Sequence, residues 1–176
     1  MSMLLYELGW RAAQGQRSTG NMKTHTTLSV VFLILACCSC SRSPETLVKG
    51  GYDEQEMDAA IARARSEVDS FIAELSKGNG TDFAVKAPIE DKEETEHFWL
   101  TDIVYRNGKF EGVIGNDPGI VTNVKSGQKW TIKKSEISDW MFMRGGKMYG
   151  NYTLRPLLKT MPEKEAARFR SMLANP

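Results

Sequence analysis

The stretch that decides the fold reads His97-Phe-Trp-Leu-Thr-Asp-Ile-Val-Tyr-Arg-Asn-Gly-Lys-Phe-Glu-Gly-Val-Ile-Gly-Asn116. Each half alternates apolar and polar residues, which is typical of a half-buried strand. Asn107-Gly108 between the halves tolerates the positive φ angles of a two-residue hairpin turn. The turn sets a register in which Thr101 faces Ile114. One face of this hairpin is therefore expected to carry the core residues Trp99, Ile103, Tyr105, Phe110 and Ile114.

Further strands are expected on both sides of this hairpin. Residues 83–89 alternate as a strand and are followed by a charged loop. Residues 120–124 and 128–133 are expected to pair with each other around Ser126-Gly127. A last hairpin is expected over residues 139–155, with its turn at Gly145-Gly146. The sequence thus predicts five or six antiparallel strands.

A helix is expected to precede the strands. Asp53 with Glu56 three residues later forms a capping-box-like start, and Gly78 is placed to end the helix. Apolar residues recur between them at spacings of three and four, which favours one helix packed on a sheet over a coiled-coil seam. The apolar stripe consists of Met57, Ile61, Ala64, Val68, Phe71, Ile72 and Leu75.

The expected fold class is α+β: one amphipathic helix on an antiparallel sheet of five or six strands, with a short C-terminal helix over residues 162–173. Pro162 occupies a favoured first-turn position of that last helix. The pattern leaves open whether the sheet stays open or curls into a barrel.

An export signal is expected between Met22 and Ala36. Lys23 gives a positive start, and the apolar run from Leu28 to Ala36 has nine residues, whereas a membrane-spanning helix needs roughly twenty. The run therefore predicts a cleaved signal. Residues 1–21 lack such a run and are interpreted as an annotation extension or a cytoplasmic tail.

The end of the apolar run, Ile34-Leu35-Ala36-Cys37, resembles the lipobox of bacterial lipoproteins. That resemblance implies a diacylglycerol-modified cysteine at the new N-terminus, either Cys37 or, as the alternative, Cys40. A signal anchor, a metal cluster or a disulfide cluster is the competing interpretation of Cys37, Cys38 and Cys40. Residues 37–51 are expected to form a tether next to the lipid, and residues 52–176 a single domain in the cell envelope, facing the periplasm or the outer surface.

Charge is distributed unevenly along the expected domain. Residues 53–96 contain 5 basic and 13 acidic residues, whereas residues 97–176 contain 13 basic and 7 acidic residues. An acidic helical half that pairs with a basic sheet half explains this pattern, and a basic face for an anionic partner is the alternative. We expect no nucleic-acid partner.

Five sequence blocks, taken in order, resemble a known family. They are Tyr52-Asp-Glu-Gln-Glu-Met-Asp-Ala-Ala-Ile-Ala-Arg-Ala64, Glu96-His-Phe-Trp99, Gly115-Asn116, Ile137-Ser-Asp-Trp-Met141 and Gly150-Asn-Tyr-Thr-Leu-Arg155. Together they are similar to the YegJ-like domain of unknown function (DUF2314), over roughly Tyr52 to Leu158. Several members of that family are small bacterial lipoproteins. The resemblance implies an architecture and a location, and it implies no activity.

The residues favour binding over catalysis. The expected domain has one histidine, His97, which on a regular strand lies on the opposite face from Asp102. A single histidine makes a zinc site improbable, and no cofactor motif is present. We therefore assign no catalytic residue, no metal and no cofactor. An envelope hydrolase whose carboxylates, such as Glu96, Asp102 and Asp139, converge from different strands is the alternative.

The last hairpin carries the candidate binding face. Its two-residue turn pairs Phe142 with Tyr149, and one face then combines flat rings with an amide and a planar cation, as interaction surfaces do. The residues of this face are Trp140, Phe142, Tyr149, Asn151 and Arg155. The other face carries Met141, Met143, Met148, Tyr152 and Leu154. A strand buried on both sides is the alternative. The expected partner is an envelope protein, peptide or polymer.

Overall fold

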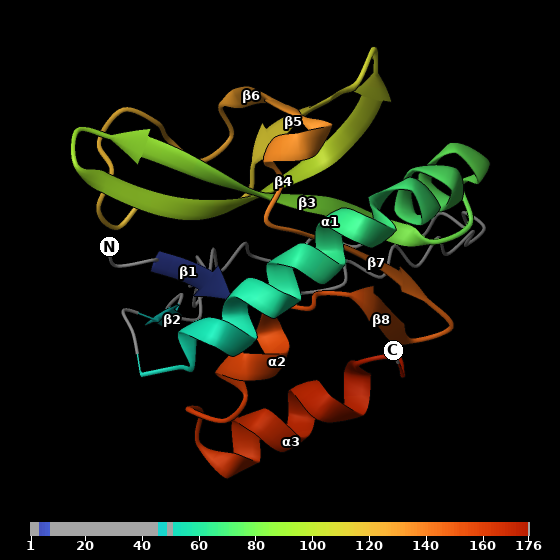
Figure 1. The fold of residues 1–176 in the computed structure, drawn as a ribbon. Coiled ribbons are helices and arrows are strands. Elements are labelled where there is room, and N and C mark those ends of the chain that lie inside the picture. The colour runs from blue at the N-terminus through green and yellow to red at the C-terminus, as the bar shows by residue number, and fades with distance from the viewer. Residues whose placement is uncertain (1–3, 8–45, 49–50, 176) are drawn as a thin grey trace, which may run out of the picture. The chain divides into compact units, whose positions relative to one another are not determined.

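The computed structural model describes residues 4–7, 46–48 and 51–175 (Figure 1). Three helices, one 3₁₀ turn and eight strands occur in this part of the chain. The helices are α1 (Glu54–Lys77), α2 (Leu154–Leu157) and α3 (Glu163–Met172), and the 3₁₀ turn is η1 (Lys134–Glu136). The strands are β1 (Leu4–Glu7), β2 (Thr46–Val48), β3 (Thr81–Asp91), β4 (Glu94–Arg106), β5 (Lys109–Ile114), β6 (Lys129–Lys133), β7 (Asp139–Arg144) and β8 (Lys147–Gly150).

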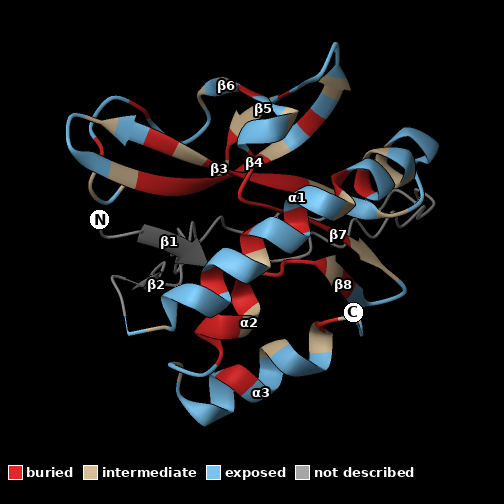
Figure 2. Ribbon diagram, viewed as in Figure 1, coloured by how far each residue is buried: buried red, intermediate tan, exposed pale blue. Residues whose placement is uncertain are grey.

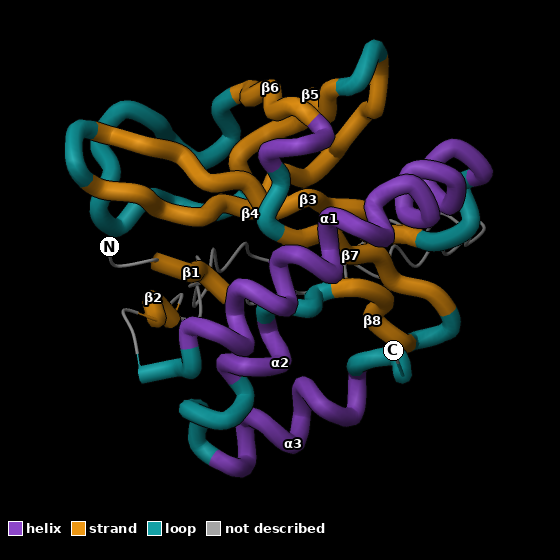
Figure 3. Tube along the Cα trace, in the orientation of Figure 1, coloured by secondary structure: helices purple, strands orange, loops and turns teal. Residues whose placement is uncertain are grey.

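Strands β3 to β8 form one antiparallel sheet in the order β6-β5-β4-β3-β7-β8. Its outermost strands, β6 and β8, do not pair with each other, so the sheet is open and not a barrel. Strand β1 lies parallel to β4 over two residue pairs, and β2 pairs with β1. The α+β class and the six antiparallel strands are confirmed. Figure 3 shows the long β3–β4 hairpin, from which β5 turns away.

Strand β4 contains a bulge that the regular hairpin pattern did not predict. Asp102 has a φ angle of +50°, and the pairing with β5 shifts between Thr101 and Val104. Thr101 consequently pairs with Val113 instead of Ile114. The expectation that Trp99 shares a face with Ile103 and Phe110 is therefore wrong, because the extra residue turns Trp99 to the opposite face.

Helix α1 begins and ends as its sequence predicts. The Asp53 carboxylate accepts a hydrogen bond from the Glu56 backbone N–H at 3.0 Å, and Gly78 closes the helix in the left-handed region, at a φ angle of +63°. The predicted stripe lies against the sheet. Figure 2 shows it as buried segments of α1 turned toward the strands. Its buried members are Met57, Ile61, Ala64, Val68 and Phe71.

Two apolar clusters fill the two faces of the sheet. The cluster under α1 includes Phe71, Phe142 and Trp140. The cluster on the opposite face joins Trp99 and Met141 of the sheet to side chains of α2 and α3. Helix α2 was missed by the sequence analysis, because its four residues are too few to show a periodicity.

Residues 115–128 form an irregular loop, so the expected strand pair around Ser126-Gly127 is wrong; β6 pairs with β5 instead. The fully buried Glu96 carboxylate accepts hydrogen bonds from the backbone N–H groups of residues 119–121, at 2.9 to 3.3 Å. Asp91 accepts two more from Thr122, each at 2.7 Å. Because these carboxylates satisfy the loop amides, a strand ladder is not needed there.

Among the described residues, no helix combines the length and the apolar character that crossing a bilayer requires.

Candidate ligand-binding cleft

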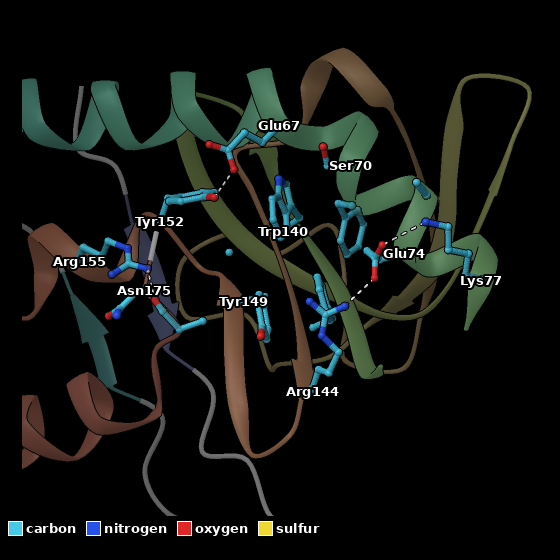
Figure 4. Close-up of a pocket in the computed structure, with 15 residues that line it drawn as sticks. Glu67, Ser70, Glu74, Lys77, Trp140, Arg144, Tyr149, Tyr152, Arg155 and Asn175 are labelled. Carbon is cyan, nitrogen blue, oxygen red and sulfur yellow. Dashed lines mark hydrogen bonds and ion pairs between the residues drawn. The ribbon is translucent and has the colours of Figure 1, made fainter. Parts of the chain in front are cut away.

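A cleft of about 470 Å³ lies between α1 and the β7–β8 hairpin (Figure 4). One wall is formed by the second half of α1, from Glu67 to Lys77. The other wall is formed by β7, β8 and the start of α2, and Ala174 with Asn175 lies at its edge. The volume falls in the range of small-molecule sites.

Stacked rings form the back of this cleft. Phe71 stacks on Trp140 with ring centroids 5.1 Å apart, and Phe142 stacks on Tyr149 at 5.0 Å. The Trp140 indole donates a hydrogen bond to the Ala64 carbonyl at 2.9 Å, which fixes the ring against α1. Trp140 and Phe142 are buried, whereas Tyr149 is half-buried. Tyr149 therefore offers more ring surface to a ligand than its two neighbours do.

Two carboxylates of α1, two helical turns apart, connect the helix to the opposite wall. Glu67 accepts a hydrogen bond from the Tyr152 hydroxyl, and the Arg144 guanidinium donates to Glu74 at 2.7 Å (Figure 4). Arg144 also lies over the Tyr149 ring, 4.4 Å from its centroid. The mouth of the cleft is therefore framed by two charge-assisted contacts.

The electrostatics of the cleft keep both carboxylates ionised. Burial raises the pKa of Glu67, but hydrogen bonds from Tyr152 and Arg63 outweigh it, so the pKa is lowered overall. Hydrogen bonding by Asn79, together with Lys77 and Arg144, lowers the pKa of Glu74. Burial and the contact with Glu67 raise the pKa of Tyr152 to about 12. Neither carboxyl group is therefore poised as a general acid, which needs a raised pKa.

Arg155 is the cation of the cleft whose charge is least compensated. Its Nη2 donates to the Ala174 carbonyl at 3.1 Å, and no carboxylate of the described residues forms an ion pair with it. Its Nε is buried and has no hydrogen-bond partner. A buried donor left without an acceptor costs about 1 to 3 kcal/mol, so this N–H favours an incoming acceptor.

The structure brings together four of the five residues of the predicted binding face: Trp140, Phe142, Tyr149 and Arg155 all line the cleft. Asn151 does not line it. This residue has a φ angle of +47°, and its side-chain amide donates to the Met148 sulfur at 3.1 Å, away from α1.

Tyr152 lies on the α1 side and not on the methionine face, so that expectation is wrong. Gly150 and Asn151 both have positive φ angles and reverse the strand alternation before Tyr152. A Cβ at Gly150 would lie 2.3 Å from the Trp140 carbonyl oxygen, so only glycine fits.

Sequence reasoning also missed Glu67, Glu74 and Arg144 as residues of the cleft. The two glutamates lie between residues of the apolar stripe of α1, at positions that are typical of a water-facing helix surface. Their spacing of seven residues, which places them on one stripe of the helix, is the only signal that could have linked them to one site.

The three carboxylates of the hydrolase alternative do not converge. Asp102 is exposed at the β4 bulge. Glu96 pairs with Ile89 and Asp139 with Lys86, three residues apart on β3, so the two carboxylates lie on opposite faces of the sheet. Glu96 is occupied by loop amides, and Asp139 by Trp140, Tyr152 and Thr153.

His97 is buried and its Nδ1 lies 2.8 Å from the Ser138 hydroxyl. Burial, with the charges of Lys86 and Arg65, lowers its pKa to about 3. Its imidazole is neutral, and Asp102 is not its partner. Among the described residues no group of three or more His, Cys, Asp or Glu side chains is arranged to hold a metal ion. Cys37 and Cys40 lie outside the described residues.

Comparison with known proteins places the chain in a family. It is 56% identical over 146 residues to the uncharacterized protein YegJ of Escherichia coli strain K12, covering 83% of this chain and 94% of that protein. It is 35% identical over 122 residues to a putative ankyrin repeat protein of Neisseria meningitidis serogroup B, covering 64% of this chain and 48% of that protein. No solved structure matches. Residues 54–174 match the family model described as "Uncharacterized protein conserved in bacteria (DUF2314)", and the chain belongs to this family.

Proposed function

We propose that this protein is a bacterial lipoprotein that is clipped and lipidated at Cys37, with Cys40 as the alternative site. Its domain is a non-catalytic binding module at the cell envelope, and the cleft between α1 and the β7–β8 hairpin holds the ligand. The observation that carries the binding role is the cleft itself, whose walls combine the half-buried Tyr149 ring with charged groups.

One further point supports binding over catalysis. Both cleft carboxylates have lowered pKa values and are held by partners.

The membrane anchor is tested by the intact mass of the full chain purified from bacterial membranes. We expect a mature protein that begins at Cys37 and carries added lipid mass, and Cys37→Ser should abolish that mass. Loss of lipid in Cys40→Ser alone would move the site to Cys40. A protein without lipid that keeps Met1 or Met22 contradicts the anchor.

The binding role is tested with Tyr149→Ala. Immobilised wild-type protein should retain solubilised envelope material that the variant loses, because Tyr149 is the half-exposed ring of the cleft. Tyr105→Ala is the matched control, since Tyr105 is also half-buried and packs on a ring, Phe110, but does not line the cleft. Equal retention by wild type and Tyr149→Ala contradicts the proposed function.

A further inference from the structure

A second hollow, of about 340 Å³, lies along the first half of α1. It is lined by Glu56, Arg63, Pro156 and Lys159 among others. It shares two wall residues, Tyr152 and Arg155, with the cleft described above. The two hollows therefore lie end to end on the same flank of α1, with Arg155 between them.

One stripe of α1 lines both hollows. Glu56, Arg63, Ser70 and Lys77 are each seven residues apart, which is close to two full turns. From the first to the last, the helix rises about 31 Å at 1.5 Å per residue. A groove of this length suits a linear ligand of several linked units better than a single small molecule.

The walls of this groove combine acceptors and donors. Along α1 the charged lining residues are, in order, Glu56, Arg63, Glu67, Glu74 and Lys77. Each of these carboxylates contacts a cation across the groove or on the same helix. A hydroxyl group both donates and accepts hydrogen bonds, so a chain rich in hydroxyls can use both kinds of wall group. The half-exposed Tyr149 ring adds a flat apolar surface.

The balance of charge favours an anionic ligand. The residues that line the two hollows include three acids and five bases. Four of the bases form ion pairs with these acids: Arg63 with Glu67, Lys77 and Arg144 with Glu74, and Lys159 with Glu56. Arg155, which both hollows share, is the fifth, and its buried Nε has no acceptor. A ligand oxyanion at this point would meet a cation that is already in place.

We propose that the two hollows form one groove that binds a carboxylate-bearing glycan strand, with a ligand carboxylate held by the partly exposed Arg155 guanidinium. The inference rests on the proposed binding function and names its ligand class. An acidic peptide is the competing ligand, because it carries carboxylates but lacks the many hydroxyl groups of a glycan.

Calorimetric titration of the detergent-solubilised full chain tests the inference with three probes. The first is a soluble saccharide that contains N-acetylmuramic acid, which bears a carboxylate. The second is a chitooligosaccharide of equal length, which lacks that carboxylate, and the third is hexaglutamate. We expect the muramic saccharide to bind about tenfold or more tightly than the chitooligosaccharide, since hydrogen bonds to charged groups are among the stronger ones.

Arg155→Gln should remove this tenfold preference, which corresponds to about 1.4 kcal/mol. Arg155→Lys keeps the charge but lacks the planar guanidinium that can bind a carboxylate with two hydrogen bonds, so it should lose most of the preference too. Arg168→Gln is the matched control, because Arg168 is exposed on α3, outside both hollows, and removes the same charge. Melting temperatures equal to wild type confirm that each variant is folded.

Equal affinity for the two saccharides, tighter binding of hexaglutamate, or an unchanged preference in Arg155→Gln would each overturn the inference. These outcomes are distinct from failure of the proposed function. The wild type can retain envelope material that Tyr149→Ala does not retain, while the protein binds both saccharides equally. In that case the cleft binds another ligand, and only the glycan assignment fails.

Discussion

Beneath α1 the sheet presents stacked rings, whereas beneath α2 and α3 it presents methionines around a buried network of charged and polar groups. Phe71 lies within 5.1 to 6.4 Å of four other rings. On the opposite face the Lys86 ammonium donates to the Thr153 hydroxyl at 2.9 Å, and that hydroxyl donates to Asp139 at 2.7 Å. Lys86, Thr153 and Asp139 are fully buried.

The two faces of the sheet differ in how strictly they determine the arrangement of the chain. Rings can adjust to one another, and a non-directional apolar face tolerates substitutions that preserve volume. A buried carboxylate is favourable only where its donors are in place. Asp139 also accepts hydrogen bonds from the backbone N–H groups of Trp140, Tyr152 and Thr153, so it ties the start of β7 to the turn before α2. The ring face contributes most of the burial, and the polar face fixes the register.

The largest expected effect comes from Asp139→Ala, which breaks the polar face. Removing one partner of a buried charge pair costs about 3 to 5 kcal/mol, and here the amides of Tyr152 and Thr153 lose their acceptor as well. We expect a loss of unfolding free energy at the upper end of that range, measured by urea denaturation. Asp69→Ala, at an exposed ion pair with Lys134, should cost less than about 1 kcal/mol. Similar losses in both variants would contradict the assigned role of the network.

Phe71→Ala breaks the ring face. The Phe71 side chain is fully buried, and truncation of a buried phenylalanine to alanine costs about 3 to 5 kcal/mol, so we expect a loss near the middle of that range. Ile72→Ala, at the next and only half-buried position, should cost clearly less. A melting temperature of Phe71→Ala within error of wild type would mean that α1 is not held by this stripe.

The smallest expected effect is a pH dependence of the unfolding free energy that comes from His97 and not from the ring face. Because the folded pKa of His97 is about 3 and its ordinary value is 6.5, the unfolded state binds more protons between these values. The stability from neutral His97 is present above pH 6.5 and is lost as pH falls toward 3, at up to about 1.4 kcal/mol per pH unit. Urea denaturation of wild type and His97→Gln between pH 7.5 and 5.0 measures this slope.

His97→Gln should flatten the pH dependence, whereas Phe71→Ala should lower the unfolding free energy equally at every pH in this window. If wild type and His97→Gln lose stability in parallel, His97 is not the group that titrates.

The sequence predicted the regular elements because their signals are local. Helix α1 has its cap and stop within its own residues, and the hairpin turns at Asn107-Gly108 and Gly145-Gly146 carry residues that accept positive φ angles. The β4 bulge was not predictable, because alternation continues on both sides of Asp102 and only the pairing with β5 reveals the extra residue.

Contacts between residues far apart in the sequence explain the other features that the sequence did not predict. Lys86 looks like a solvent-facing strand residue in sequence, but Asp139 and Thr153, more than fifty residues away, make its burial possible. The candidate site was predictable on the hairpin side, where Trp140, Phe142 and Tyr149 follow from the turn. Its α1 side was not, because Glu67 and Glu74 look like ordinary water-facing residues until the fold places a hairpin beside them.

The segment after α3 forms part of the cleft wall. Leu173 makes a parallel bridge to Met148, the Ala174 N–H donates to the Met148 carbonyl, and the Ala174 carbonyl accepts from Arg155. A chain that ends after α3 would therefore lose this wall. It would also lose the carbonyl group that holds the Arg155 guanidinium in its present position.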